Sequence, residues 1–205
     1  MPLKLQTPIW YAISSGLTTS KTTPDDPEFA FILHLIKTAV FSEVPLFQIR
    51  EKNLPARRLF ELASRAAEIT RGSSTRLLVN DRFDVARAAG ADGVHLSESS
   101  LPPRVVRETC GEEFLIGAST HSLESARAAR NGGADFVVFG PVFETESKRA
   151  FGPPQGLEKL REVATALQGF PVLAIGGVTI DNAASCFAAG ASGAAGISWF
   201  NASHR

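Results

Sequence analysis

The stretch Ala134–Gly156, ADFVVFGPVFETESKRAFGPPQG, places an apolar run directly before a polar, proline-containing loop. The run Phe136–Phe139 ends at Gly140, and uninterrupted apolar character of this length is typical of a parallel strand buried on both faces. Hydroxyl groups and cations follow it, Lys148 and Arg149 among them. Because such groups at the carboxyl end of a buried strand suit an anionic ligand, the stretch predicts a binding loop. The alternative is a solvated loop.

The start of this stretch belongs to a pattern that occurs three times. Gly132–Val137 reads GGADFV, Ala89–Val94 reads AGADGV, and Ala189–Ala194 reads AGASGA. In each copy a helical segment ends on glycine, as a helix C-cap often does, and an apolar strand follows. The pattern therefore predicts a repeated β/α unit, although its spacing is too irregular for a tight solenoid.

Apolar runs alternate with segments of helical spacing along the whole chain. The expected strands are Ile9–Ser14, Leu46–Ile49, Leu77–Val79, one ending near Leu96, Phe114–Ala118, Phe136–Gly140, Val172–Ile175 and Gly193–Ile197. The expected helices are Phe29–Phe41, Pro55–Thr70, Phe83–Ala89, Pro103–Thr109, Ser122–Asn131, Gly156–Leu167 and Thr179–Ala189. This alternation predicts one α/β domain over residues 1–205, a (β/α)8 TIM barrel whose last helix is short or missing. Trp199 and Phe200, or a second subunit in a homodimer, would cover the apolar seam left there.

Composition excludes several classes of partner. The chain has 21 basic and 21 acidic residues and a formal net charge of zero, which argues against nucleic acid or an anionic membrane surface as the main partner. Cys110 and Cys186 are too few for a disulfide framework, so a reducing cytoplasm is the simplest compartment. No apolar run is long enough for a signal peptide or a membrane span.

Polar side chains follow several expected strands at their carboxyl ends, where barrels of this kind carry their chemistry. Gln48, Arg50 and Lys52 alternate along an extended segment and would converge on one anion, unless they form a solvated turn. Asn80 and Asp81 come after the third strand. They predict an amide contact and a metal-ligating carboxylate, or Asp81 is a helix cap.

The later strand ends add a proton-transfer candidate and a phosphate site. His95 lies within its strand and reads as a satisfied core histidine, whereas His121 falls beyond its strand and is the better acid/base candidate. Ser119 and Thr120 are ligand donors or helix caps. Glycines let backbone N–H groups approach a ligand, and Gly176-Gly177 and Gly196-Ile197-Ser198 end consecutive strands at the position where this fold often binds phosphate.

Together these motifs make the chain resemble the family of thiamine phosphate synthases and TenI-type thiazole tautomerases, from about Tyr11 to Ser198. They are QIREK at Gln48–Lys52, VND at Val79–Asp81, GADGVHL at Gly90–Leu96, GASTH at Gly117–His121, GPVFETESK at Gly140–Lys148, AIGG at Ala174–Gly177 and IS at Ile197-Ser198.

The resemblance implies a transferase that joins hydroxymethylpyrimidine diphosphate to thiazole phosphate and releases pyrophosphate. By that resemblance, the diphosphate would be held by Gln48, Arg50, Lys52, Asn80 and Lys148, with Ser119 beside it. The thiazole phosphate would be held by Thr145, Ser147, Gly177, Ile197 and Ser198, and Asp81 would bind Mg²⁺. Cations around the leaving diphosphate would stabilise its growing negative charge.

Departures from the family pattern leave two further hypotheses. Ser100 stands where a synthase has an aspartate that is a second Mg²⁺ ligand, and Glu98 would have to substitute for it. VFET and Thr120–Ser122 favour the tautomerase branch, which needs neither metal nor diphosphate and in which His121 would be the acid/base group. Lys52, Asn80 and Asp81 favour the synthase. A barrel that binds a thiamine precursor as a non-catalytic regulator is the third hypothesis.

Overall fold

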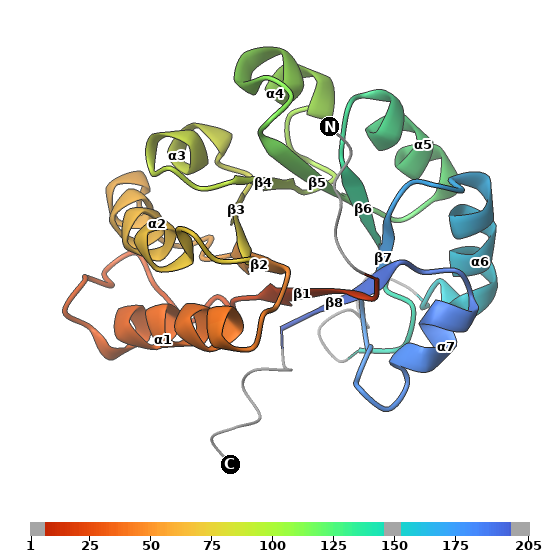
Figure 1. The fold of residues 1–205 in the computed structure, drawn as a ribbon, viewed down its shortest axis with the longest axis horizontal. Coiled ribbons are helices and arrows are strands. Elements are labelled where there is room, and N and C mark those ends of the chain that lie inside the picture. Colours follow the sequence, from red (N-terminus) through yellow and green to blue (C-terminus); the bar gives the residue numbers. More distant parts are fainter. Residues whose placement is uncertain (1–6, 146–152, 198–205) are drawn as a thin grey trace. The chain divides into compact units, whose positions relative to one another are not determined.

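A computed structural model describes residues 7–145 and 153–197 of the chain. In these ranges eight strands and seven helices alternate, and the strand order is that of a closed parallel barrel, β1 to β8 (Figure 1). The strands are β1 (Ile9–Ile13), β2 (Leu46–Ile49), β3 (Arg76–Asn80), β4 (Gly93–Leu96), β5 (Leu115–Thr120), β6 (Phe136–Phe139), β7 (Val172–Ala174) and β8 (Gly193–Gly196). The helices are α1 (Pro27–Phe41), α2 (Ala56–Thr70), α3 (Phe83–Ala88), α4 (Pro103–Cys110), α5 (Leu123–Asn131), α6 (Gly156–Ala166) and α7 (Ala183–Ala188). The predicted fold class is confirmed.

The chain divides into two compact units. Of the described residues, the amino-terminal unit holds 11–95 and 197, and the carboxy-terminal unit holds 7–10 and 96–196. Parallel pairing joins β1 to β4 in order and β5 to β8 in order. That the whole chain is a single domain stays a prediction, and Trp199 and Phe200 lie outside the described residues. Among the helices of the described ranges, none combines the length and apolar character that a membrane crossing needs.

The amino-terminal unit is built around strands that are buried on both faces. All four residues of β2 are buried, as expected for a parallel strand covered by helices. In Figure 1, α1, α2 and α3 lie on the outer side of these strands. Helix α2 places Leu59, Leu62 and Ala66 on its buried face, and this spacing of three and four residues is the one predicted from sequence.

The carboxy-terminal unit follows the same plan. All four residues of β6 are buried, which confirms the interpretation of the run Phe136–Phe139. The predicted helix Thr179–Ala189 is shorter than expected, because α7 begins only at Ala183. Side chains of Thr179 and Asn182 bind each other's backbone N–H groups, at 2.8 and 3.3 Å, and so form a turn that precedes the helix.

The threefold sequence pattern corresponds to one repeated backbone geometry. Gly90, Gly133 and Gly190 each have positive φ, between 74° and 95°, which glycine adopts without steric cost. In two copies the aspartate after the Gly-Ala pair accepts a hydrogen bond from the first residues of the preceding strand: Leu77 N to Asp92 Oδ2 at 2.8 Å and Ile116 N to Asp135 Oδ2 at 2.7 Å. The pattern therefore marks the entry of each strand into the sheet.

Candidate functional site

In the amino-terminal unit, Gln48 occupies the carboxyl end of β2 and is 1% exposed. Its Nε2 donates a hydrogen bond to Oη of Tyr11 at 2.9 Å. Within the described part of the chain, its Oε1 has no hydrogen-bond partner. Because a buried carbonyl oxygen is costly to leave without a donor, this oxygen is available to a ligand N–H or to an ordered water.

Two cations follow β2 without charged partners. Arg50 is half-buried and Lys52 is exposed in the turn that continues the strand. Considering residues 7–145 and 153–197 only, neither side chain takes part in an ion pair. Unpaired cations at the carboxyl end of a barrel strand suit a polyanionic ligand. Anion binding by QIREK stays a prediction.

Asn80 is the last residue of β3, and Asp81 follows it. Because β3 pairs with β2, both residues lie next to the segment that carries Arg50 and Lys52. Nδ2 of Asn80 donates to Oδ2 of Asp81 at 2.7 Å, and the backbone N–H of Asp81 donates to the carbonyl of His95 at 2.9 Å. Asp81 has a φ of 58°, an unusual value outside glycine. Helix α3 has Arg82 at its N-cap, so the alternative that Asp81 is the N-cap is wrong.

His95 is a core residue, as expected. Burial lowers its pKa to about 4, the nearby Asp81 raises that pKa and Arg50 lowers it further. Its ring lies against the ring of Tyr11, with centroids 5.6 Å apart, and burial raises the pKa of Tyr11 well above 10.0. Both rings are therefore neutral at pH 7.

The described residues offer few carboxylates that could bind Mg²⁺. They contain no group of three or more His, Cys, Asp or Glu side chains that could hold a metal ion. Ser100 has no carboxylate to offer: its Oγ accepts from the N–H of Ser97 at 2.9 Å and lies 2.8 Å from the Ser97 hydroxyl. Mg²⁺ at phosphate sites is usually held by one or two carboxylates together with substrate phosphates. Asp81 fits that role as the single carboxylate of this unit's site.

In the carboxy-terminal unit, His121 directly follows β5, and Ser119 lies within the strand. The strand runs two residues further than predicted. Neither Ser119 nor Thr120 is the N-cap of α5, as one alternative had it, because Ser122 occupies that position in a capping box with Ser125. Ser119 remains a candidate ligand donor at the strand end.

The ring of His121 is oriented by two neighbours. Its Nδ1 makes a short contact with the carbonyl oxygen of Gly140, and its Nε2 lies 3.8 Å from Oε2 of Glu98. Since a carbonyl oxygen only accepts hydrogen bonds, Nδ1 carries the proton in the neutral ring. Nε2 is then the nitrogen that can exchange a proton with a ligand.

Gly176 and Gly177 form a tight turn after β7, with φ of 90° and 65°. The N–H of Phe143 donates to the carbonyl of Gly176 at 2.9 Å, and Nδ2 of Asn182 donates to the carbonyl of Gly177 at 2.8 Å. A Cβ on Gly177 would meet Cβ of Phe143 at 2.7 Å. The turn thus holds Phe143, at the start of the loop after β6, in contact with Gly177. Glycine is required at position 177 because a side chain would collide with Phe143.

The remaining predicted phosphate ligands are only partly described. Thr145 lies two residues after Phe143, and Ile197 follows β8 with 39% of its surface exposed. Ser147, Lys148 and Ser198 lie outside the described residues, and their predicted roles stay predictions.

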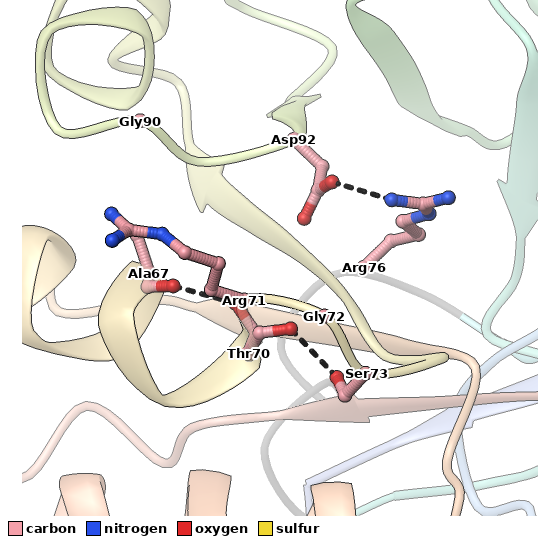
Figure 2. Close-up of a pocket in the computed structure, with 8 residues that line it drawn as sticks. All are labelled: Ala67, Thr70, Arg71, Gly72, Ser73, Arg76, Gly90 and Asp92. Carbon is pink, nitrogen blue, oxygen red and sulfur yellow. Dashed lines mark hydrogen bonds and ion pairs between the residues drawn. The ribbon is translucent and has the colours of Figure 1, made fainter.

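The amino-terminal unit contains a cavity of about 400 Å³ whose lining includes none of the predicted site residues. It is lined by Ala67, Thr70, Arg71, Gly72, Ser73, Arg76, Gly90 and Asp92, which belong to the loops before β3 and β4 (Figure 2). Figure 2 shows the guanidinium of Arg76 directed at Asp92, 3.0 Å away, while Arg71 points away from that pair. The cavity is therefore at the amino ends of the strands, where this fold carries stability and not catalysis.

Sequence reasoning missed two residues that shape the amino-terminal half of the site. Tyr11 and Glu51 are both almost fully buried. In the sequence, Tyr11 lies within the expected strand Ile9–Ser14, and Glu51 lies within the charged motif QIREK. The only available signal for Glu51 was its position between two basic residues, because its partners lie more than 30 residues away in the sequence.

Comparisons with known proteins agree on one family. A family model described as thiamine monophosphate synthase (TMP-TENI) matches residues 21–200 of the chain. A putative thiamine-phosphate synthase from Geobacter sulfurreducens is 46% identical over 167 residues, which cover 82% of this chain and 78% of that protein. A thiamine-phosphate synthase from Moorella thermoacetica is 42% identical over 166 residues, covering 81% of this chain and 79% of that protein.

Solved structures give the same result. The thiamine phosphate pyrophosphorylase from Pyrococcus furiosus superposes with a TM-score of 0.75 at 33% identity, covering 92% of this chain and 85% of that chain. A structure titled "Native KDPGal structure" has a TM-score of 0.68 at 18% identity, a likeness of fold alone.

Proposed function

We propose that this chain, which belongs to the thiamine monophosphate synthase family, joins hydroxymethylpyrimidine diphosphate to thiazole phosphate and releases pyrophosphate. The chain is accordingly a transferase of thiamine biosynthesis. The observation that carries the proposal is a pair of cations, Arg50 and Lys52, which make no ion pair within residues 7–145 and 153–197 and follow β2, the strand paired with β3 and its last residue Asn80. A polyanionic leaving group needs such a site, and proton transfer on a thiazole does not.

The reaction is a displacement at the methylene carbon of the pyrimidine. The bond from this carbon to the diphosphate oxygen breaks, and the diphosphate leaves with the electron pair. The thiazole nitrogen then donates its lone pair to the methylene carbon, which forms the new carbon–nitrogen bond. Arg50, Lys52 and the Asn80 amide would stabilise the negative charge that grows on the leaving oxygens.

Each substrate has its own phosphate-binding group in this proposal. The cations after β2 would bind the diphosphate group, together with Lys148 and Ser119. Gln48 would contact the same substrate, with its Oε1 accepting from an N–H of the pyrimidine. The Gly176-Gly177 turn, with Thr145, Ser147, Ile197 and Ser198, would hold the thiazole phosphate through backbone N–H groups and hydroxyls. Holding the thiazole by its phosphate would restrict its nitrogen to productive orientations.

Mg²⁺ would be held by Asp81 together with oxygens of the diphosphate. When bound, it would supply positive charge at the leaving group. The hydrogen bond from Asn80 to Asp81 at 2.7 Å orients the carboxylate for this purpose. With Ser100 in place of a second aspartate, Asp81 is the only protein carboxylate that we assign to the ion.

The proposal is tested by mixing the purified chain with both substrates and Mg²⁺ and measuring released pyrophosphate and thiamine phosphate. We expect equal amounts of both products, and neither when one substrate is omitted. No pyrophosphate release with both substrates and millimolar Mg²⁺ would contradict the proposed function.

The contact between His121 and Gly140 favours a second candidate, tautomerisation of a thiazole carboxylate phosphate. The ring is fixed with Nδ1 protonated and Nε2 available. His121→Ala should abolish that isomerisation if His121 is the acid/base group, and unchanged isomerisation would remove it as the catalyst. The non-catalytic regulator hypothesis is excluded by turnover of either substrate. A cytoplasmic location and a homodimer stay predictions.

A further inference from the structure

A buried carboxylate lies between the two cations of the proposed diphosphate site. Glu51 is 2% exposed, whereas its neighbours Arg50 and Lys52 are half-buried and exposed. Its Oε1 accepts hydrogen bonds from Oγ of Ser14 at 2.6 Å and from the N–H of Gly16 at 3.1 Å. Its Oε2 accepts from the N–H and Oγ1 of Thr18, at 3.0 and 2.7 Å.

All four partners of Glu51 are neutral donors. The carboxylate therefore makes no ion pair with Arg50 or Lys52 in the described part of the chain. Four donors satisfy the buried charge, which would otherwise be costly. Glu51 therefore does not neutralise Arg50 or Lys52, whose charges remain available to a ligand. Its carboxylate instead holds the neighbouring backbone through these hydrogen bonds.

Glu51 joins the segment after β2 to the loop that follows β1. Ser14 takes part twice, because its Oγ donates to Glu51 and accepts from the backbone N–H of Arg50 at 2.8 Å. Nδ2 of Asn53 adds a bond to the carbonyl of Thr18 at 3.3 Å. The backbone on both sides of Glu51 is thus held to the Ser14–Thr18 segment. These hydrogen bonds fix the backbone positions of Arg50 and Lys52.

We propose that Glu51 is a positioning residue for diphosphate binding, through its hydrogen bonds to Ser14, Gly16 and Thr18. The inference rests on the proposed function and deepens it. Glu51 does not touch the substrate. It holds the turn that carries Arg50 and Lys52 in one conformation before the diphosphate arrives, so that binding does not have to order the turn.

The test is Glu51→Gln, which keeps the shape of the side chain. The amide nitrogen would replace an oxygen that now accepts from one backbone N–H and one hydroxyl. The N–H would lose its acceptor, the hydroxyl would have to reverse and accept, and the charge of the acceptor would be gone. We expect KM for the pyrimidine diphosphate, and the dissociation constant of pyrophosphate with Mg²⁺, to rise about tenfold, equivalent to about 1.4 kcal/mol. KM for the thiazole phosphate should change less than about twofold, within the range of a neutral substitution.

A matched control and a milder variant separate this role from a general loss of stability. Glu61→Gln removes a half-buried carboxylate that binds Arg58 at 2.8 Å on the same unit, and it should leave both constants unchanged. Thr18→Val removes one donor to Glu51 and should raise the same two constants about threefold, the effect of losing one hydrogen bond. It also provides the test if Glu51→Gln does not fold.

The outcomes distinguish this inference from the proposed function. A folded Glu51→Gln, or Thr18→Val, with a lower melting temperature but unchanged pyrophosphate affinity would show a purely structural role and overturn the inference. Wild-type protein that binds pyrophosphate without turnover would contradict the proposed function, while the comparison of pyrophosphate affinities would still decide the role of Glu51. Wild-type protein that neither binds pyrophosphate nor turns over would overturn both.

Discussion

The side-chain amide of Asn80 donates a hydrogen bond to Oδ2 of Asp81, with the two atoms 2.7 Å apart. Asp81 has a backbone φ of 58°, and this bond orients the carboxylate that we propose as the Mg²⁺ ligand. We predict that Asp81→Asn, which removes the charge and keeps the shape, lowers kcat/KM by about 100-fold, equivalent to about 2.7 kcal/mol. Pyrophosphate release measured against Mg²⁺ concentration checks this, and the variant should need much more Mg²⁺ for half-maximal rate.

Asp84→Asn is the control for this prediction. Asp84 lies three residues further along, in α3, where its carboxylate binds Arg82 at the surface. The substitution removes the same charge from the same region and should leave the Mg²⁺ requirement unchanged. Equal responses of the two variants to Mg²⁺ would mean that Asp81 contributes only general negative charge.

Arg50→Gln tests the cations after β2. The substitution removes an unpaired charge and keeps much of the side-chain length, so we expect KM for the pyrimidine diphosphate to rise at least tenfold, about 1.4 kcal/mol or more. KM for the thiazole phosphate should stay within about twofold. The control is Arg57→Gln in α2, whose side chain is 84% exposed. Parallel increases for both substrates would contradict a specific role in diphosphate binding.

Gly177→Ala tests the turn that we assign to the thiazole phosphate. An added Cβ would lie 2.7 Å from Cβ of Phe143 and 2.8 Å from the carbonyl oxygen of Glu144, so the loop after β6 has to shift. We expect KM for the thiazole phosphate to rise about tenfold or more, since misplacement of a phosphate handle costs binding energy. Saturation curves with the thiazole phosphate varied and the pyrimidine diphosphate fixed provide the measurement.

Gly169→Ala separates crowding from backbone strain. Gly169 also has positive φ, 81°, but a Cβ there would have nothing within 4 Å. Gly169→Ala should therefore lower the free energy of unfolding by about 1 kcal/mol and leave KM for the thiazole phosphate unchanged. An equal rise of KM in both variants would show that strain, and not the contact with Phe143, is responsible.

Sequence patterns predicted the fold well because its determinants are local. Four-residue apolar runs such as Phe136–Phe139, glycines at helix ends and the threefold Gly-Ala pattern each fix a short segment, and all appear in the structure as expected. The errors are at boundaries where side chains compete with the helix backbone. The Thr179–Asn182 turn delays α7, and Ser122 is the N-cap of α5 in place of Ser119 or Thr120.

The site was predicted less completely, because its supporting contacts are long-range. Gln48, Arg50 and Asn80 were identified by motif, yet nothing near Glu51 in the sequence indicates that Ser14 and Thr18 bind its carboxylate. A carboxylate between two basic residues is by default expected to neutralise them. Only the three-dimensional contacts reverse that expectation.

Arg107 is predicted to be a structural arginine of the carboxy-terminal unit. Its guanidinium donates to Oδ2 of Asp135 at 2.8 Å and to the carbonyls of Gly133, Gly111 and Phe114. Arg107→Met should lower the free energy of unfolding by about 3 kcal/mol, because the Asp135 carboxylate keeps the N–H of Ile116 but loses its cationic partner, and three carbonyls lose the guanidinium donor. Urea denaturation measures this.

Arg104→Met is the matched control on the same helix. Arg104 is 75% exposed on its side chain and lies 3.6 Å from Glu108, a surface pair of small energetic value. Its free energy of unfolding should match that of the wild type within about 0.5 kcal/mol. A similar loss in both variants would contradict the role given to the Arg107 hydrogen bonds.

His95 gives the fold a specific dependence on pH. Burial lowers the pKa of the folded-state imidazole to about 4 from its ordinary value of 6.5, so the unfolded chain binds a proton more readily than the folded one. The stabilisation is fully present above pH 6.5 and is lost as pH falls through about 4. At about 1.4 kcal/mol for each pKa unit, the loss attributable to His95 between pH 7 and pH 4.5 is on the order of 2 kcal/mol. Urea unfolding of the wild type and of His95→Gln at both pH values isolates this contribution. Between the two pH values, the free energy of unfolding of His95→Gln should fall by about that much less than that of the wild type.

His34→Gln, at an exposed position of α1, is the control and should retain the wild-type dependence of unfolding free energy on pH. If His95→Gln loses as much stability as the wild type over this range, the acid sensitivity arises from the carboxylates, and the imidazole is not kept neutral by its burial.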